Sequence, residues 1–206
     1  MLIWEKNTEV NWMEKNKIRK QALKERAALP KEDRDRASER IAGLLFFCSE
    51  YQNARQVFSY VAFREEADTY KILRRAIKDG KQVAVPKVVG PHHMEFYYID
   101  SLEQLSAGYM GIPEPEATGK TPACPDEQTI FLVPGAAFDA KGGRIGYGGG
   151  FYDAYFSSNP PGIRVGIGFS SQIVPQIPTQ EHDCCMDWIA TEKGIEQCRN
   201  NYQKIR

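Results

Sequence analysis

The densest group of residues that could do chemistry lies between Val133 and Phe156, where the chain reads VPGAAFDAKGGRIGYGGGFYDAYF. Glycines at 146, 148, 149 and 150 allow positive φ angles and place no Cβ in the way of a ligand. Successive backbone N–H groups in such a loop can converge on phosphate oxygens, and Arg144 adds a planar set of donors. The glycine spacing alone is equally typical of a plain turn. A phosphate site is therefore one of two interpretations.

Standard nucleotide-binding motifs do not explain this loop. The pattern GxGxxG fails because Phe151 stands where the third glycine would be. Residues 119–121 spell the GKT of a Walker motif, but Glu114 occupies the position of its first glycine. Pro122 and Pro125 also do not suit the helix that would follow. We therefore interpret 119–121 as an ordinary loop and predict no dinucleotide fold.

The elements that must position the loop alternate between strands and helices. Helical patterns cover 15–29, the segment from Pro30 to Cys48, and 70–79. Apolar runs of strand length occur at 57–62, 83–85, 95–99, 130–133, 162–168 and 188–191. Residues 111–128 are rich in proline, glycine and acids and predict a surface loop. The pattern predicts an α/β fold, a single three-layer domain over 1–206 with a largely parallel sheet flanked by helices. Residues 1–12 are expected to form a poorly ordered N-terminal extension.

The full string PGAAFDAKGGRIGYGGGFYDAYF closely resembles the signature of the 5-formyltetrahydrofolate cyclo-ligase family, in which PG-x-x-FD leads to R-[LI]-G-x-G-x-G-[YF]-YD. The resemblance covers nearly the whole chain and includes Lys15 with Arg19, and the segments 60–69, 111–115, 168–172 and 178–187. It implies an ATP-dependent ligase that cyclises 5-formyltetrahydrofolate, with or without a polyglutamate tail, to 5,10-methenyltetrahydrofolate, releasing ADP and phosphate.

The same resemblance implies where ATP binds. Lys15 and Arg19 are four residues apart, so they share one helical face and together could hold a triphosphate. Without the resemblance, the pair would be interpreted as a solvated basic face. Arg144 and Tyr152 are the implied catalytic residues. The implied ATP contacts are Lys15, Arg19, Arg144, Ile145, Gly146, Tyr147, Gly148, Gly149, Gly150, Phe151 and Tyr152.

Folate and metal contacts are implied elsewhere along the chain. The folate positions are Val61, Glu66, Met110 and Phe151, where a carboxylate could accept hydrogen bonds from the pterin and apolar side chains could cover its ring. Glu66 has the alternative of being an exposed loop acid beside Glu65. The family uses Mg²⁺, and its ligand positions correspond to Asp153 and Asp183, which agrees with the preference of Mg²⁺ for a few carboxylates plus phosphate oxygens.

The loop also departs from some members of the family. They carry Arg and Lys within it and a second aromatic hydroxyl after it, where this chain has Tyr147, Gly149 and Phe151. We therefore expect weaker ATP binding. Two other functions stay open at this point. The chain could be a non-catalytic module that holds folate or nucleotide, which turnover would exclude, or an enzyme of phosphorylated sugars or acyl-CoA, which fold analogy alone suggests.

Composition limits the partners. Lys plus Arg and Asp plus Glu both total 27, so no net charge attracts the protein to nucleic acid or a membrane surface, and we expect neither as a partner. Five cysteines without a CxxC pair suit a reducing compartment, so a cytoplasmic protein is expected. We also expect a monomer. His182 with Cys184 and Cys185 lacks the second spaced pair of a structural zinc site, and no zinc site is predicted.

Overall fold

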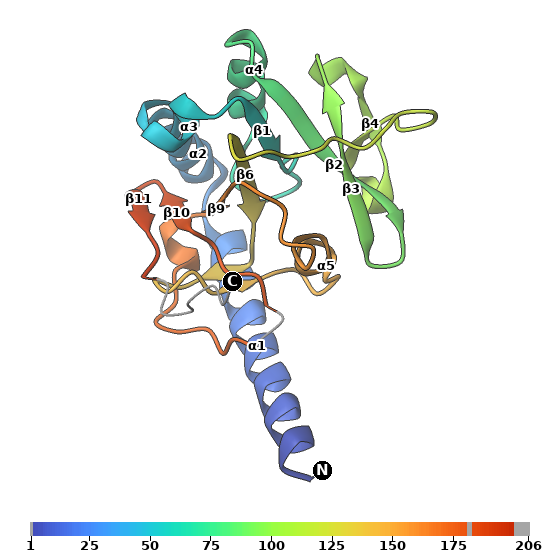
Figure 1. Ribbon diagram of the computed structural model, residues 1–206. Coiled ribbons are helices and arrows are strands. Elements are labelled where there is room, and N and C mark those ends of the chain that lie inside the picture. The colour runs from blue at the N-terminus through green and yellow to red at the C-terminus, as the bar shows by residue number, and fades with distance from the viewer. Residues whose placement is uncertain (1, 181–182, 200–206) are drawn as a thin grey trace.

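The structure is a computed structural model that describes residues 2–180 and 183–199. Its centre is a seven-stranded sheet with the order β11-β10-β9-β6-β1-β2-β3 (Figure 1). The strands of this sheet are β1 (Gln56–Ser59), β2 (Gln82–Gly90), β3 (His93–Ile99), β6 (Thr129–Pro134), β9 (Ile163–Ile167), β10 (Trp188–Thr191) and β11 (Gly194–Gln197). Two smaller sheets pair β4 (Leu105–Ala107) with β5 (Pro113–Pro115) and β7 (Ala137–Phe138) with β8 (Arg144–Ile145).

The middle of the large sheet is parallel, as the sequence predicts. Strand β1 pairs in parallel with β2 and β6, and β9 pairs in parallel with β6 and β10. Only the edge pairs β2 with β3 and β10 with β11 are antiparallel. A parallel sheet is buried on both faces, which explains why β6 is an unbroken apolar run. The α/β prediction is therefore confirmed.

Alternate residues along the strands of the large sheet belong to two separate apolar layers, one on each face of the sheet. On one face, Val57 and Leu132 pack with Ile41 and Leu45 of α2 (Lys31–Phe47) and Leu73 of α4 (Tyr70–Lys78). On the other face, Phe58, Phe131 and Val133 pack with Phe156 of α5 (Phe151–Phe156). Since successive side chains of a strand point to opposite faces, this division follows from a period of two residues. A short helix, α3 (Ser49–Asn53), joins α2 to β1.

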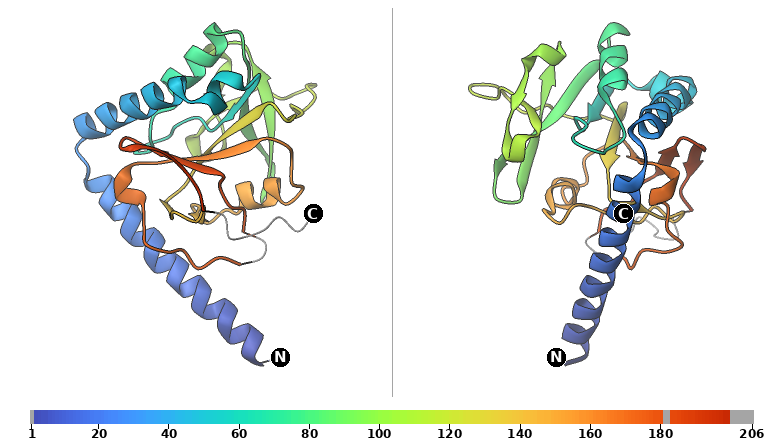
Figure 2. Two further views of the ribbon diagram at one scale, coloured as in Figure 1. Left: turned by 60° about the vertical axis from the view of Figure 1, so that its left-hand side comes forward. Right: turned by 180° about the vertical axis from the view of Figure 1, so that it is seen from behind.

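Helix α1 (Leu2–Ala28) lies apart from the main sheet, and its N-terminal part projects away from the rest of the molecule (Figures 1 and 2). Its C-terminal part packs Ala22 against Ala137 and Ile145 of the β7–β8 hairpin and against Ile177. The helix begins well before Lys15, where the sequence predicts its start, and takes in residues 2–12, which the sequence places in a poorly ordered extension. Among the described residues, no helix is both long and apolar enough to cross a membrane.

Two predictions about the segments between the strands need correction. Strands β2 and β3 are longer than predicted and form one antiparallel hairpin. The segment 111–128 is not entirely surface loop, because β5 contains Glu114, which is 6% exposed and accepts a hydrogen bond from the Val88 amide at 3.1 Å. Residues 119–121 are an exposed loop with Gly119 at a φ of +72°, which confirms the prediction of an ordinary loop. Short 3-10 turns occur at η1 (Leu102–Gln104), η2 (Tyr109–Gly111) and η3 (Ser170–Gln172).

Candidate active site

The glycine loop runs from the end of β8 to the start of α5, and the hairpin β7–β8 stands between it and β6. Gly148 and Gly150 have φ angles of +105° and +69°, which other residues adopt only with strain. Gly146 and Gly149 are limited by space instead, because a Cβ at these positions would lie 2.9 Å from Arg144 Nη1 and 2.7 Å from the Phe151 ring. The loop therefore needs glycine at four positions for two different reasons.

The backbone amides of this loop have no hydrogen-bond partner in the part of the chain that the structure describes. Across residues 2–180 and 183–199, no hydrogen bond comes from the backbone N–H groups of 146–150. The carbonyl groups are used, since Gly146 O accepts from Arg19 Nε at 2.8 Å and Gly149 O contacts His92 Nδ1 at 2.7 Å. Strong donors without partners favour an acceptor such as phosphate. Because α5 has six residues, the loop amides carry this argument and the helix dipole does not.

Helix α1 carries both predicted cations on one face, as their four-residue spacing predicts, and it brings Arg19 to the loop. Arg19 reaches Gly146 O, while Lys15 Nζ lies 2.5 Å from Asp183 Oδ2. The Lys15 and Asp183 side chains are each 15% exposed, so this ion pair is well shielded from water. The structure thus joins residues 168 positions apart in the chain. These contacts favour a role for Lys15 and Arg19 in the site over the alternative that they form a solvated basic face of the helix.

Arg144 is the most buried cation of the predicted site, with its side chain 3% exposed. Its Nη2 lies 2.8 Å from Asp153 Oδ1, its Nη1 donates to Pro134 O at 3.3 Å, and its Nε is buried without a partner in the described residues. The guanidinium also lies 5.5 Å from the centre of the Tyr152 ring. The Tyr152 hydroxyl is likewise buried and unpaired within the described part of the chain. Burial raises the pKa of Tyr152, so its hydroxyl stays protonated and able to donate.

The two predicted metal ligands each face one of these cations, Asp153 facing Arg144 and Asp183 facing Lys15. Asp183 Oδ2 also accepts from the Gln180 amide at 2.7 Å. In the described ranges, no three Asp, Glu, His or Cys side chains lie together as metal ligands. A Mg²⁺ ion commonly takes one or two carboxylates and completes its shell with phosphate oxygens and water. Asp153 and Asp183 have the chemistry of such ligands, and their role as metal ligands stays a prediction. His182 of the zinc argument lies outside the described residues.

The predicted folate residues lie on segments far apart in the chain. Val61 is 3% exposed just after β1, and Glu66 Oε2 accepts from the Phe63 amide at 2.9 Å. Met110 is 73% exposed with a φ of +53°, and the ring of its neighbour Tyr109 lies 5.7 Å from the Phe151 ring. The structure thus places the Met110 turn beside the loop.

Burial raises the pKa of Glu66, and three favourable contacts oppose that effect: hydrogen bonds from Tyr147 and the Phe63 amide, and the nearby charge of Arg26. A carboxylate in such a setting is not a freely solvated loop acid. The alternative interpretation of Glu66 is therefore not favoured by its surroundings.

Sequence reasoning missed several residues that shape the site. Arg26 donates to the Tyr147 hydroxyl at 2.7 Å. Asp139 is 1% exposed and accepts from the amides of Lys141, Gly143 and Ile177 at 2.7–2.9 Å, which ties the hairpin to a distant segment. Asp139 is the acid of the PG-x-x-FD string, so that string carried a signal for it. Arg26 and His92 had no local signal.

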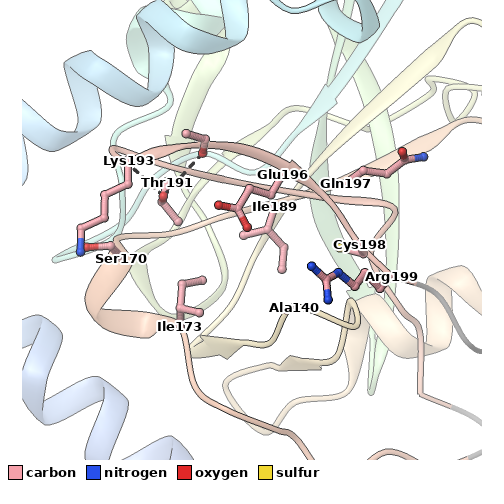
Figure 3. Close-up of a pocket in the computed structure, with 11 residues that line it drawn as sticks. Ala140, Ser170, Ile173, Ile189, Thr191, Lys193, Glu196, Gln197, Cys198 and Arg199 are labelled. Carbon is pink, nitrogen blue, oxygen red and sulfur yellow. Dashed lines mark hydrogen bonds between the residues drawn. The ribbon is translucent and has the colours of Figure 1, made fainter.

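A separate cavity of about 410 Å³ lies beside β10 and β11 (Figure 3). Lys193, Glu196 and Arg199 supply its charged side chains, and Ile173 and Ile189 supply apolar ones. Among the described residues that line it, none belongs to the predicted site. This cavity is therefore not part of the predicted site.

Comparisons with known proteins agree on one family. Residues 11–192 match the model of the 5-formyltetrahydrofolate cyclo-ligase family. A relative from Schizosaccharomyces pombe, described as a probable 5-formyltetrahydrofolate cyclo-ligase, is 32% identical over 163 residues, which cover 71% of this chain and 79% of the relative.

Solved structures give the same result. The NMR structure of Aquifex aeolicus 5,10-methenyltetrahydrofolate synthetase aligns with a TM-score of 0.79 and 31% identity over 90% of this chain and 93% of that one. A 5,10-methenyltetrahydrofolate synthetase from Mycoplasma pneumoniae shares the fold, with a TM-score of 0.69 and 20% identity over 86% of this chain and 98% of that one. The chain belongs to the 5-formyltetrahydrofolate cyclo-ligase family.

Proposed function

We propose that the loop 146–150, the facing side of α1 and the segment around Glu66 form the active site of a 5-formyltetrahydrofolate cyclo-ligase. The reaction closes 5-formyltetrahydrofolate to 5,10-methenyltetrahydrofolate and converts ATP to ADP and phosphate. The observation that carries the proposal is the set of unpaired loop amides beside Arg19 and Arg144. Such donors stabilise a triphosphate and the charge that shifts during phosphoryl transfer.

The phosphate side of the site holds ATP. The loop amides bind phosphate oxygens, Arg19 orients the loop through Gly146 O, and Lys15 and Arg144 contribute positive charge. Asp153 and Asp183 would hold Mg²⁺ through their carboxylates, and the ion supplies further neutralisation of the phosphates. Because Tyr147 and Gly149 add no cation to the loop, we expect ATP affinity to depend strongly on the cations of α1 and β8.

The folate side places the formyl group next to the terminal phosphate. Glu66 accepts hydrogen bonds from the pterin, while Val61, Met110 and Phe151 cover its ring. The formyl oxygen attacks the γ-phosphorus and ADP leaves, then N10 attacks the activated formyl carbon, loses its proton, and phosphate leaves with the former formyl oxygen. The protonated Tyr152 hydroxyl is a donor for an oxygen in this path, and Arg144 stabilises the negative charge on the transferred group.

The direct test follows the absorbance of methenyltetrahydrofolate after purified protein is mixed with 5-formyltetrahydrofolate, ATP and Mg²⁺. Product should appear only when ATP is present, with one ADP formed for each ring closed. Calorimetric binding of folate or ATP without any product would support the non-catalytic module instead. No product and no binding would reject both.

We further propose that residues 1–206 act as one domain, as a monomer in the cytoplasm. The shared central sheet supports one domain, because both of its apolar layers extend across strands from the two halves of the chain. The five cysteines are all free, which agrees with a reducing compartment. Light scattering of the purified protein tests the monomer directly.

A further inference from the structure

Arg26 is a buried cation that the phosphate site does not use. It lies seven residues after Arg19 on α1, two helical turns further along the same face. The residue is 6% exposed, its Nη1 donates to the Tyr147 hydroxyl at 2.7 Å, and its guanidinium lies 5.4 Å from the Tyr147 ring centre. Its Nε is buried and has no partner among the described residues. Burying an arginine with an unpaired donor costs free energy of folding, unless its charge interacts favourably with a nearby group.

The partner of this charge is the carboxylate of Glu66. The Tyr147 hydroxyl accepts from Arg26 Nη1 and donates to Gly135 O at 3.3 Å. It also lies close enough to the Glu66 carboxylate to favour the ionised form and lower the pKa of that group. The positive charge of Arg26 also acts on Glu66 directly. The titratable groups that influence this carboxylate, or that it influences, are Arg26, Tyr60, Glu65, Tyr147 and Tyr152.

Arg26 is the positive member of this group that acts on Glu66, while Glu65 acts against the ionised form. Burial disfavours the ionised carboxylate, and the hydrogen bonds from Tyr147 and Phe63, with the Arg26 charge, favour it. A pterin presents N–H donors, so it is recognised by an ionised and correctly oriented carboxylate. Removing Arg26 would weaken both properties at once.

We propose that Arg26 is a positioning residue for folate recognition, which acts through Tyr147 to orient Glu66 and keep it ionised. The inference rests on the proposed role of Glu66 in binding the pterin. It assigns the cations of α1 to different substrates, because Lys15 and Arg19 act on the phosphates of ATP whereas Arg26 acts on the pterin. Cations on one face of α1 would then control the affinity of the protein for both ATP and folate.

The test compares Arg26→Gln and Tyr147→Phe with the wild type in the absorbance assay. Lys24→Gln, an exposed lysine on the same helix, is the matched control. Each of the two site variants should raise the KM for 5-formyltetrahydrofolate about tenfold, as expected for the loss of one charge-assisted hydrogen bond, and change the KM for ATP by less than about threefold. Together they should raise the folate KM by less than the product of the single effects, because they act in one chain of contacts.

Two further measurements separate positioning from simple structural support. The folate KM of Arg26→Gln should fall again as the pH is raised, because a higher pH ionises Glu66 without the help of Arg26. Arg26→Lys should recover part of the wild-type KM. Tyr147→Phe removes only a hydroxyl from a residue that is 44% exposed, so it still tests the proposal if Arg26→Gln does not fold.

The proposal is overturned if the KM for ATP rises as much as that for folate, or if both single variants keep the wild-type folate KM. A wild-type protein without ATP-dependent turnover would instead reject the proposed function, so the two failures are distinguishable.

Discussion

In the proposed active site, the loop 146–150 would face the phosphates of ATP and the segment around Glu66 would face the pterin, and the two regions are built in different ways. The loop offers backbone amides, and its conformation depends on glycines at positive φ and on close approach of Arg144 and Phe151. The Glu66 segment offers one partly buried carboxylate whose charge depends on side chains from α1 and from the loop. If the proposed site is correct, phosphate recognition is mainly a property of the backbone, and pterin recognition is a property of a side-chain network.

The largest expected effect comes from the buried cation beside the loop. Arg144→Ala should lower kcat about 100-fold, because it removes a buried donor that stabilises charge on the transferred phosphoryl group. Arg144→Lys keeps the charge and should lose less. The measurement is steady-state turnover beside Arg40→Ala, an exposed arginine on α2. A kcat for Arg144→Ala equal to that of this control would refute the catalytic role.

The next effect tests whether Lys15 and Arg19 of α1 contribute to ATP binding but not to folate binding. Lys15→Met and Arg19→Met should each raise the KM for ATP about tenfold and leave the folate KM nearly unchanged, since each removes one charge-assisted contact from the phosphate side. Lys20→Met, exposed on the same helix, is the control. An unchanged KM for ATP in both variants would show that phosphate binding depends on the loop alone.

A smaller change should follow when the loop backbone is strained. Gly148→Ala places a Cβ at a φ of +105°, which costs about 1–2 kcal/mol and shifts the amides from their positions. The KM for ATP should rise about threefold to fivefold, because part of this cost is expressed in ATP binding and 1 kcal/mol corresponds to about fivefold, while the folate KM should stay the same. Gly194→Ala has open space and no positive φ, so it serves as the control. Equal ATP KM values in the two variants would contradict the backbone role.

The smallest effect concerns stability and applies to the Glu66 side only. Burial raises the pKa of Glu66 above its unfolded value, so ionisation of this group at neutral pH opposes folding. This loss of stability is absent below the pKa that Glu66 has in the unfolded chain. It grows as the pH rises from there through the higher pKa that Glu66 has in the folded protein. Glu66→Gln should therefore melt a few degrees higher than the wild type at about pH 8 but not at about pH 4, while its folate KM rises. A lower melting temperature at both values would mean that the carboxylate stabilises the fold.

Much of the fold was predictable because its signals are local. The apolar run at 130–133 and the helical pattern at 70–79 appear as β6 and α4 with nearly the predicted bounds. The hairpin β2–β3 was missed, since its pairing depends on contacts across the turn at Pro91 and His92 that no periodicity records. The strand character of 113–115 was missed for a similar reason, because a proline-rich segment pairs with β4 only through its place in the fold and through the burial of Glu114.

The features of the site likewise divide into those with a local signal in the sequence and those that depend on distant contacts. Glycines at the loop, the four-residue spacing of Lys15 and Arg19, and the family signature were all present in the sequence, because glycine content and helical spacing act over a few residues. Which groups meet was decided by tertiary structure: Lys15 with Asp183, Arg26 with Tyr147, and His92 with Gly149 O. These partners lie 57 to 168 residues apart in the chain. A hydrogen bond or an ion pair acts only over a few ångströms, so such partners are determined only once the sheet has brought their segments together.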